Sequence, residues 1–272
     1  MTTSVAESAA PLVEVCSVSK SFGSAKVLDN VSLIVRTGQT TSLVGESGSG
    51  KSTLARIVTG LETFDDGKVL FRGLPRPRRG KAARALQRTM GVVLQDPYES
   101  IDPRFTVGEV VAEPLRAHRS YGHDGQEKVR ELLASCGLSD VSLDAPVHKF
   151  SGGQRQRMCV ARALATDPDF IVCDEPTSAL DVSVQAQILN LLLRLQRERG
   201  IAYLFITHDI EVVRRISDHV AVMHQGKIVE SGPTVDVTSN PQAPYTQRLL
   251  SAVLGDSPHA RKLAGPGAPA LT

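Results

Sequence analysis

Short apolar stretches, spaced by polar and glycine-rich segments, run through most of the chain. Leu12–Val18 alternates apolar and polar residues and is predicted to be a strand, as is Val31–Val35. Thr40–Val44, Phe170–Cys173 and Ala202–Ile206 are short runs typical of strands buried inside a sheet. These last three are predicted to form the centre of the fold.

Longer segments with helical patterns separate the strands. They are predicted at Ser52–Val58, Val107–His118, Gly125–Cys136, Ser151–Thr166 and Val182–Arg199. Further strands are predicted at Lys68–Arg72, Val92–Leu94, His219–Met223 and Lys227–Ser231, the last two forming a hairpin. Alternating strands and helices predict an α/β fold with a mainly parallel sheet covered on both faces. Between Gln95 and Phe170 the sequence is mostly helical, which predicts a helical insert in this core.

The composition is that of an ordinary globular protein and changes this picture little. Of the 272 residues, 41% are hydrophobic and 22% are charged, and the net charge is +2. No apolar run approaches the roughly 20 residues that are needed to cross a bilayer. A membrane role would therefore depend on a partner.

A basic run without a single acidic residue lies between Gly67 and Gln95. It contains Arg72, Arg76, Arg78, Arg79, Lys81, Arg84 and Arg88. Such a run can bind nucleic acid, but more often it is a solvated loop and helix face. Because the net charge is near zero and no aromatic residues interleave the run, we expect no nucleic-acid partner.

A glycine-rich loop joins the Thr40–Val44 strand to the helix that follows it. The loop fits the phosphate-binding pattern G-x-x-x-x-G-K-S/T completely, with the residues Gly45, Glu46, Ser47, Gly48, Ser49, Gly50, Lys51 and Ser52. Glycines let such a loop fold tightly, so that its N–H groups and the helix N-terminus point at phosphate oxygens. Lys51 is predicted to reach the β- and γ-phosphates and Ser52 to ligate Mg²⁺, while Thr53 supplies a further hydroxyl.

A second chemical feature is the acidic end of the Phe170–Cys173 strand. Asp174 and Glu175 follow the strand directly. An Asp at the tip of a buried strand can hold Mg²⁺, usually through water, and a neighbouring Glu can position or polarise the attacking water. A strand that merely ends in polar surface residues is the alternative, but together with the phosphate loop the pair indicates a P-loop NTPase.

A third motif narrows the family. The segment Phe150–Arg157 contains Ser151, Gly152, Gly153 and Gln154, and it resembles the signature of ABC ATPases. Four other family positions are matched by Phe22 (the aromatic that stacks on adenine), Gln95 (the Q-loop), Asp181 (the D-loop) and His208 (the switch histidine). This resemblance implies an ABC-type nucleotide-binding domain: a P-loop core, an antiparallel β subdomain and a helical subdomain.

The resemblance also implies a division of the chain. We expect the nucleotide-binding domain at 12–235, with the helical subdomain at about 97–165 inserted in its core. A C-terminal helical extension is expected at 236–254. The segment 255–272 is rich in Gly, Pro and Ala and is predicted to be disordered.

Two stretches give a narrower resemblance, 94–104 around the Q-loop and 240–250 near the C-terminus. Both are similar to the oligopeptide, dipeptide and nickel importer ATPases. This implies an importer subunit that energises uptake of peptides, nickel or a similar small solute. The implied partners are two permease subunits, a second ABC ATPase (a relative or another copy) and an extracytoplasmic solute-binding protein. The implied location is peripheral, on the cytoplasmic side of the membrane.

A soluble complex without transport activity is the alternative, because subunits of carbon–phosphorus lyase resemble the same group. ABC proteins of DNA repair and translation usually carry long coiled coils or two tandem domains, and this chain has neither.

The family mechanism assigns the site residues to two halves. Phe22, the phosphate loop, Gln95, Glu175 and His208 would form one half-site for ATP, with Ser52, Gln95 and Asp174 at the Mg²⁺ ion. Ser151, Gly152, Gly153 and Gln154 would close over the γ-phosphate held by a second chain packed head to tail. Lys51, Glu175 and His208 are the expected catalytic residues.

Overall fold

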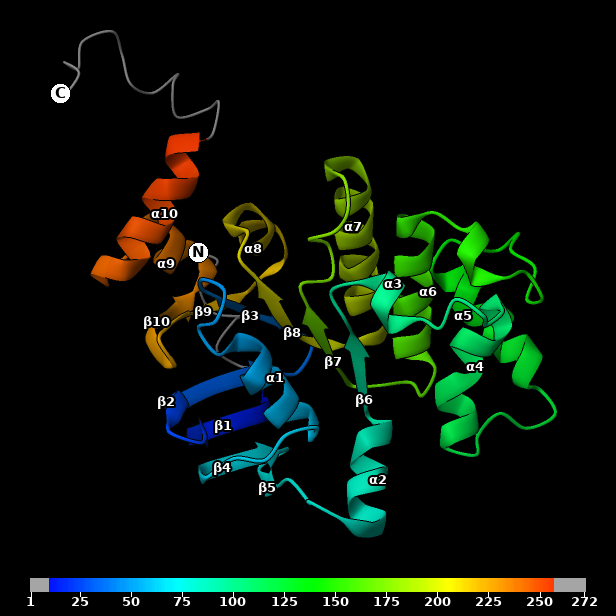
Figure 1. Ribbon diagram of the computed structural model, residues 1–272, viewed down its shortest axis with the longest axis horizontal. Coiled ribbons are helices and arrows are strands. Elements are labelled where there is room, and N and C mark those ends of the chain that lie inside the picture. Colours follow the sequence, from blue (N-terminus) through cyan, green and yellow to red (C-terminus); the bar gives the residue numbers. More distant parts are fainter. Residues whose placement is uncertain (1–9, 257–272) are drawn as a thin grey trace, which may run out of the picture.

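Two β-sheets form the framework of the computed structural model, which describes residues 10–256 (Figure 1). The smaller sheet is antiparallel, in the order β2-β1-β4-β5. Its strands are β1 (Pro11–Phe22), β2 (Ala25–Arg36), β4 (Asp66–Phe71) and β5 (Leu74–Pro75). The larger sheet has the order β10-β9-β3-β8-β7-β6. Its strands are β3 (Thr40–Val44), β6 (Met90–Val93), β7 (Phe170–Asp174), β8 (Ala202–Thr207), β9 (His219–His224) and β10 (Lys227–Pro233).

The larger sheet is parallel from β9 to β6, and only the edge strand β10 runs antiparallel to its neighbour. The helices that follow its strands are α1 (Lys51–Thr59), α7 (Val182–Arg199) and α8 (Ile210–Ile216). The other helices are α2 (Gly80–Arg88), α3 (Pro97–Ser100), α4 (Val107–Ala117), α5 (Gly125–Ser135), α6 (Gly152–Leu164), α9 (Thr234–Ser239) and α10 (Pro244–Asp256), with a 3₁₀ turn at Val147–Lys149. The predicted α/β class with a mainly parallel core sheet is confirmed.

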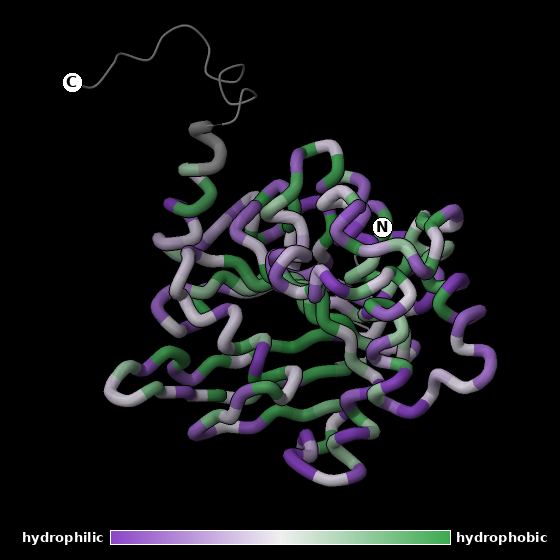
Figure 2. The backbone as a smooth tube through the Cα atoms, turned by 45° about the vertical axis from the view of Figure 1, so that its right-hand side comes forward, coloured by the Kyte–Doolittle hydropathy of each residue, from purple (hydrophilic) through white to green (hydrophobic). Residues whose placement is uncertain are grey.

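Side chains on the central strands alternate between two hydrophobic clusters. On β7, Ile171 and Cys173 pack with helices α4 to α7, whereas Phe170 and Val172 pack with α1 and the antiparallel sheet. All four are at most 1% exposed, so the strand is covered on both faces. Figure 2 shows these strands as hydrophobic stretches inside a more hydrophilic periphery.

A third cluster joins the C-terminal helices to the core. Val44 of β3 and Val222 of β9 pack with Val237, Tyr245 and Leu250 from α9 and α10. The helices α9 and α10 therefore pack against the core sheet next to Val44, the residue that immediately precedes the phosphate loop.

Several elements differ from their predicted bounds, and the reasons are physical. β1 continues past Val18, where bulges shift the register and interrupt the alternation that a sequence pattern would show. α2 was not predicted because none of its residues is fully buried, and Leu86 packs only partly against the core. α8, which was also missed, has only seven residues.

The end of the chain shows one further difference. α10 ends at Asp256, so residues 255 and 256 are helical and not part of a disordered tail. Residues 257–272 of the predicted tail lie outside the described residues. Within residues 10–256, no helix combines the length and the apolar character that crossing a membrane requires.

Candidate nucleotide site

The phosphate loop lies between the last residue of β3 and the first turn of α1. Two positions of the loop require glycine, because each has a positive φ and lies close to another segment of backbone. A Cβ on Gly45 (φ 157°) would lie 2.1 Å from the carbonyl oxygen of Met223, and one on Gly50 (φ 108°) would lie 2.9 Å from that of Val27. Gly50 is also the N-cap of α1, where no side chain caps the helix. The first amides of α1 therefore remain open to an anion.

Lys51, the first residue of α1, folds its side chain back onto the loop and is only 6% exposed. Its Nζ donates hydrogen bonds to the carbonyl oxygens of Gly45 and Glu46, each at 2.8 Å. Burial lowers the pKa of Lys51, while the charges of Glu175 and Asp174 oppose this shift. The loop thus holds a partly desolvated cation, whose attraction to phosphate is stronger than in water.

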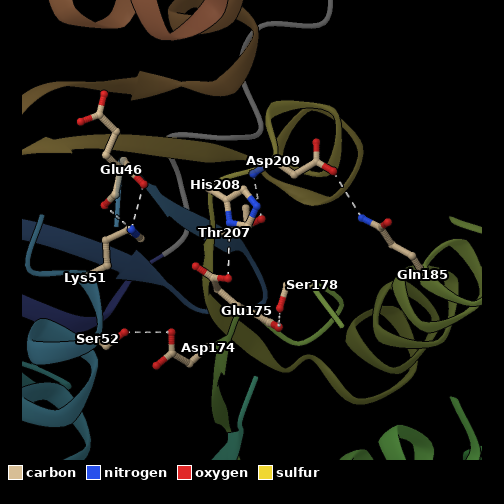
Figure 3. Close-up of polar contacts among 11 residues, drawn as sticks. Glu46, Lys51, Ser52, Asp174, Glu175, Ser178, Gln185, Thr207, His208 and Asp209 are labelled. Carbon is tan, nitrogen blue, oxygen red and sulfur yellow. Dashed lines mark hydrogen bonds and ion pairs between the residues drawn. The ribbon is translucent and has the colours of Figure 1, made fainter. Parts of the chain in front are cut away.

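Asp174, at the end of β7, faces the start of α1. Its Oδ1 accepts a hydrogen bond from Ser52 Oγ at 3.3 Å, as Figure 3 shows. Burial raises the pKa of Asp174, and the bond from Ser52 lowers it in part. A hydroxyl and a carboxylate side by side are oxygen donors of the kind that Mg²⁺ prefers.

The described residues contain no group of three or more His, Cys, Asp or Glu side chains placed to hold a metal. Mg²⁺ is usually held by one or two protein oxygens together with waters and substrate phosphates. The donor set of Ser52 and Asp174 therefore suits a magnesium ion that arrives with a nucleotide.

Glu175 follows Asp174 in a strained backbone conformation, with φ 46°. Non-glycine residues in this region cost on the order of 1–3 kcal/mol and cluster at functional sites. The N–H of Glu175 donates to the carbonyl of Ile206 at 3.0 Å, and this bond holds Glu175 against the neighbouring strand β8. His208, just after β8, places Nδ1 3.3 Å from Glu175 Oε2. The strain is thus maintained by neighbours on the adjacent strand.

An open cleft of about 670 Å³ joins these groups. Its lining consists of Val27, Ser47, Gly48, Gly50, Lys51, Ser52, Thr53, Gln95, Glu175 and His208. The structure therefore brings together the predicted residues of the phosphate loop, the Q-loop glutamine, the acidic residue and the switch histidine. Four strands of the parallel sheet, β3, β6, β7 and β8, supply them at one edge, because their carboxyl ends meet there.

Phe22 is not in the lining of this cleft. It ends β1, its ring is 48% exposed, and the Nζ of Lys20 lies 4.8 Å from the ring centroid. An exposed ring on the antiparallel sheet is open for stacking, and its predicted contact with adenine stays a prediction.

The signature residues lie apart from the cleft, at the start of α6. Ser151 and Gln154 form a reciprocal capping box, in which Ser151 Oγ accepts from Gln154 N at 3.3 Å and Gln154 Oε1 accepts from Ser151 N at 3.0 Å. A Cβ on Gly153 would lie 2.5 Å from Val184, so this glycine permits α6 to approach α7. Gly152 has more room, with its nearest neighbour at 3.6 Å. Within one chain, these residues do not meet the phosphate loop.

Asp181 likewise has a local role. Its side chain caps α7 by accepting from Val184 N at 2.9 Å and from Ser183 Oγ at 2.7 Å. These bonds, the backbone one first, hold the pKa of Asp181 below its ordinary value. The carboxylate is thereby kept charged at the first turn of the helix.

Two residues at the site were not singled out from the sequence. Val27 lines the cleft from β2, where it belongs to no motif. Tyr245, in α10, receives a hydrogen bond from the backbone N–H of Glu46 at 3.3 Å. Tyr245 falls in the C-terminal stretch that carries the narrower resemblance, but no residue spacing links that stretch to the phosphate loop.

Comparison with known families agrees with this geometry. A family described as ABC transporter matches residues 28–178, more than half of the chain. The chain belongs to the ABC transporter family. It is therefore an ABC ATPase, as predicted, and ATP is its nucleotide. The roles of the individual site residues stay predictions.

Curated relatives place the chain within the importer group. It is 46% identical over 235 residues to the oligopeptide transport ATP-binding protein OppF of Bacillus subtilis (strain 168), covering 85% of this chain and 77% of that protein. It is 51% identical over 229 residues to the glutathione import ATP-binding protein GsiA of Escherichia coli (strain K12), covering 83% of this chain. The chain spans only 37% of the length of that GsiA protein. These relatives are transport subunits, and they give no support to the alternative of a soluble complex without transport activity.

Solved structures confirm the fold. CbiO1 from Clostridium perfringens, described as part of the ABC transporter complex cbiONQ, superposes with a TM-score of 0.79 at 26% identity, covering 93% of this chain and 98% of that one. The ATP-binding cassette MJ0796, solved as a dimer in a post-hydrolysis state with ADP and Pi, gives a TM-score of 0.72 at 29% identity, covering 82% and 99%. The ABC cassette architecture predicted from the motifs is thus confirmed.

Proposed function

We propose that this ABC ATPase drives an importer for peptides or a similar small solute, with ATP bound in the cleft beside the phosphate loop. The observation that carries the proposal is the convergence of Lys51, Glu175 and His208 on one open cleft. The relatives OppF and GsiA support the choice of a peptide-like solute, because their names refer to oligopeptide and glutathione transport.

In this proposal the phosphate loop binds the triphosphate. Lys51, held at the loop carbonyls, also donates to the β- and γ-phosphates, and the uncapped first amides of α1 donate to phosphate oxygens. Ser52, Asp174 and Gln95 are the residues that would hold Mg²⁺. The ion would supply positive charge at the β- and γ-phosphates.

Glu175 and His208 act on the water that attacks the γ-phosphorus. The Glu175 carboxylate orients this water and accepts its proton, while His208 holds the carboxylate through the contact of 3.3 Å and reaches the γ-phosphate. The bond to the leaving ADP oxygen breaks as the bond to water oxygen forms. Lys51 stabilises the negative charge that spreads over the γ-phosphoryl group.

A second ATPase subunit completes the site. Ser151, Gly152, Gly153 and Gln154 of one chain close over the nucleotide held by the other, and Phe22 stacks on adenine. Two observations support this arrangement: Val182, next to the D-loop Asp181, is 83% exposed despite being apolar, and the relative MJ0796 was solved as a dimer. The second subunit is a related ATPase in the importer group, or another copy of this chain.

Permeases dock near the Q-loop in this proposal. A groove of about 340 Å³ lies between α4, α6 and the strand β6, and Leu61, Leu94, Glu113 and Pro114 line it. Leu61 and Leu94 are 71% and 42% exposed, so the groove offers apolar surface to a partner. The groove adjoins Gln95 and the segment 97–103, so its occupant would sense the γ-phosphate. The chain would thereby lie peripherally on the cytoplasmic side of the membrane, and an extracytoplasmic binding protein would deliver the solute.

The test is reconstitution of the native complex. The tagged chain is purified in mild detergent, its co-purifying subunits are identified, and the complex is placed in liposomes. ATP-dependent uptake of labelled oligopeptides is then measured, with Glu175→Gln as the matched inactive variant. We expect two polytopic permeases and uptake that the variant abolishes. Recovery of soluble enzymes alone would contradict the importer assignment. Hydrolysis that no peptide stimulates in the complete complex would contradict peptides as the solute.

A further inference from the structure

A hydrogen bond links the C-terminal helix α10 to the phosphate loop. The hydroxyl of Tyr245 accepts from the backbone N–H of Glu46, the second residue of the loop, at 3.3 Å. The two residues are 199 positions apart in the chain. Tyr245 lies outside the segment 28–178 that matches the family, whereas Glu46 lies within it.

The peptide unit that carries this N–H is also the one that holds the lysine. The Glu46 N–H and the Gly45 carbonyl belong to the same planar peptide group. The Gly45 carbonyl accepts from Lys51 Nζ at 2.8 Å. Tyr245 and Lys51 therefore bind opposite ends of one rigid plane, and fixing one end fixes the direction of the other.

The Tyr245 ring is itself held in place. It is 8% exposed and stacks on the His224 ring, with centroids 3.9 Å apart and an angle of 26° between the planes. It packs in the same hydrophobic cluster as Val44, the residue that precedes the phosphate loop. The hydroxyl is thus presented to the loop by a buried and stacked ring.

The start of α10 is anchored to the core sheet by a carboxylate. Glu230, on β10, accepts from the N–H groups of Gln242 at 2.8 Å and Ala243 at 3.0 Å. Burial raises the pKa of Glu230, but these hydrogen bonds outweigh it, so that the pKa lies below its ordinary value. Glu230 is therefore ionised near neutral pH and binds the two amides that lead into α10. α10 lies beside α9 and β10 in Figure 1.

We propose that Tyr245 is a positioning residue for ATP binding, through which α10 orients the Gly45–Glu46 peptide and with it the ammonium group of Lys51. The inference rests on the proposed phosphate site. Tyr245 touches no reacting atom and acts only through the loop. The C-terminal extension is then part of the nucleotide site.

Burial is the largest cause that raises the pKa of Tyr245, and the charge of Glu46 raises it further. The phenol is therefore protonated at neutral pH. It accepts the Glu46 N–H as a neutral group.

The test is Tyr245→Phe, which removes the hydroxyl and keeps the ring that stacks on His224. Loss of one neutral hydrogen bond predicts a KM and a Kd for ATP that rise about two- to tenfold, with kcat close to wild type. The matched control is Tyr121→Phe, which removes a hydroxyl from a ring packed beneath Arg116 in the helical region. It should leave KM, Kd and kcat unchanged.

A second variant removes the anchor without touching the ring. Glu230→Gln should raise KM in the same direction and by less, because α10 stays packed by its apolar side chains. Thermal unfolding of each variant is measured alongside. A lower Tm together with a lower kcat at unchanged KM would show a merely structural role and would overturn the inference.

Lys51→Ala separates this inference from the proposed site. If Lys51→Ala binds ATP as the wild type does, the phosphate-loop assignment itself is wrong. If Lys51→Ala loses affinity while Tyr245→Phe keeps wild-type KM and Kd, only the role of Tyr245 is wrong.

Discussion

Two helices begin at glycine-rich segments, α1 at the phosphate loop and α6 at the signature, and their first turns differ. At α1 the N-cap is Gly50, and no side chain bonds the first amides. At α6 the N-cap is Ser151, which closes a capping box with Gln154. The first turn of α1 is thus incomplete without an anion, whereas that of α6 is partly satisfied by its own side chains.

The surroundings of these two helix starts also differ, in burial and in the charges nearby. Lys51 is buried near two carboxylates and the cleft, whereas Ser151 and Gln154 are exposed. Tertiary contacts within one chain therefore bring the phosphate loop, the acidic residues and His208 together. In the proposed mechanism, the signature residues act only when a second subunit brings a nucleotide to them. The predictions below test this division, from the largest expected effect to the smallest.

The largest effect is expected at Glu175. Glu175→Gln keeps the side-chain shape and removes the base, so turnover should fall by about 10²- to 10⁴-fold while ATP affinity is retained. Phosphate release and ATP titration on the same preparation measure the two quantities. Near wild-type hydrolysis would show that the base lies elsewhere.

Lys51→Ala should act on binding itself. Removing a buried cation that bonds phosphate predicts a loss of about 10- to 100-fold in ATP affinity, even in the isolated chain. Titration calorimetry checks this, with Lys81→Ala on the exposed helix α2 as a charge-matched control. If Lys51→Ala and Lys81→Ala bound ATP with equal affinity, Lys51 would not be part of the ATP site.

Ser151→Ala should leave ATP binding to the isolated chain unchanged and weaken ATP-dependent association about tenfold. Association is measured by sedimentation in the Glu175→Gln background. Because Ser151 also caps α6, a loss of about 1 kcal/mol of stability is expected as well.

Thr106→Ala is the control for that stability loss, since Thr106 closes the equivalent capping box on α4. It should cost similar stability without affecting association. Weaker ATP binding by monomeric Ser151→Ala would contradict the division into two halves.

The smallest effect concerns pH. Glu230 has a folded pKa below its ordinary 4.5, so its contribution to stability is complete above that value and disappears only as pH falls through the lower folded pKa. Tyr245 has a pKa above its ordinary 10.0 and stays protonated over the same range. The ratio of KM between Tyr245→Phe and the wild type should therefore be constant from about pH 6 to pH 8. A ratio that changes within this window would show that another titrating group controls the contact.

Much of the site was predictable because its signals are local. The strand, loop and helix around Lys51 follow one another directly, and the acidic pair follows β7 without a gap. Such short-range order fixes both the residue types and their place at the carboxyl edge of the sheet. By contrast, bulges concealed the length of β1, and α2 has no fully buried residue to mark its inner face.

The sequence by itself determined the family, the ATP chemistry and the residues expected at each motif. Only the tertiary structure decided which of them meet within one chain: Glu175 with His208 across neighbouring strands, Ser52 with Asp174, and Ser151 with none of them. It also brought Tyr245 to the phosphate loop from 199 residues away. The physical reason is that motifs record local backbone requirements, whereas such contacts depend on how sheet order and helix packing place distant segments.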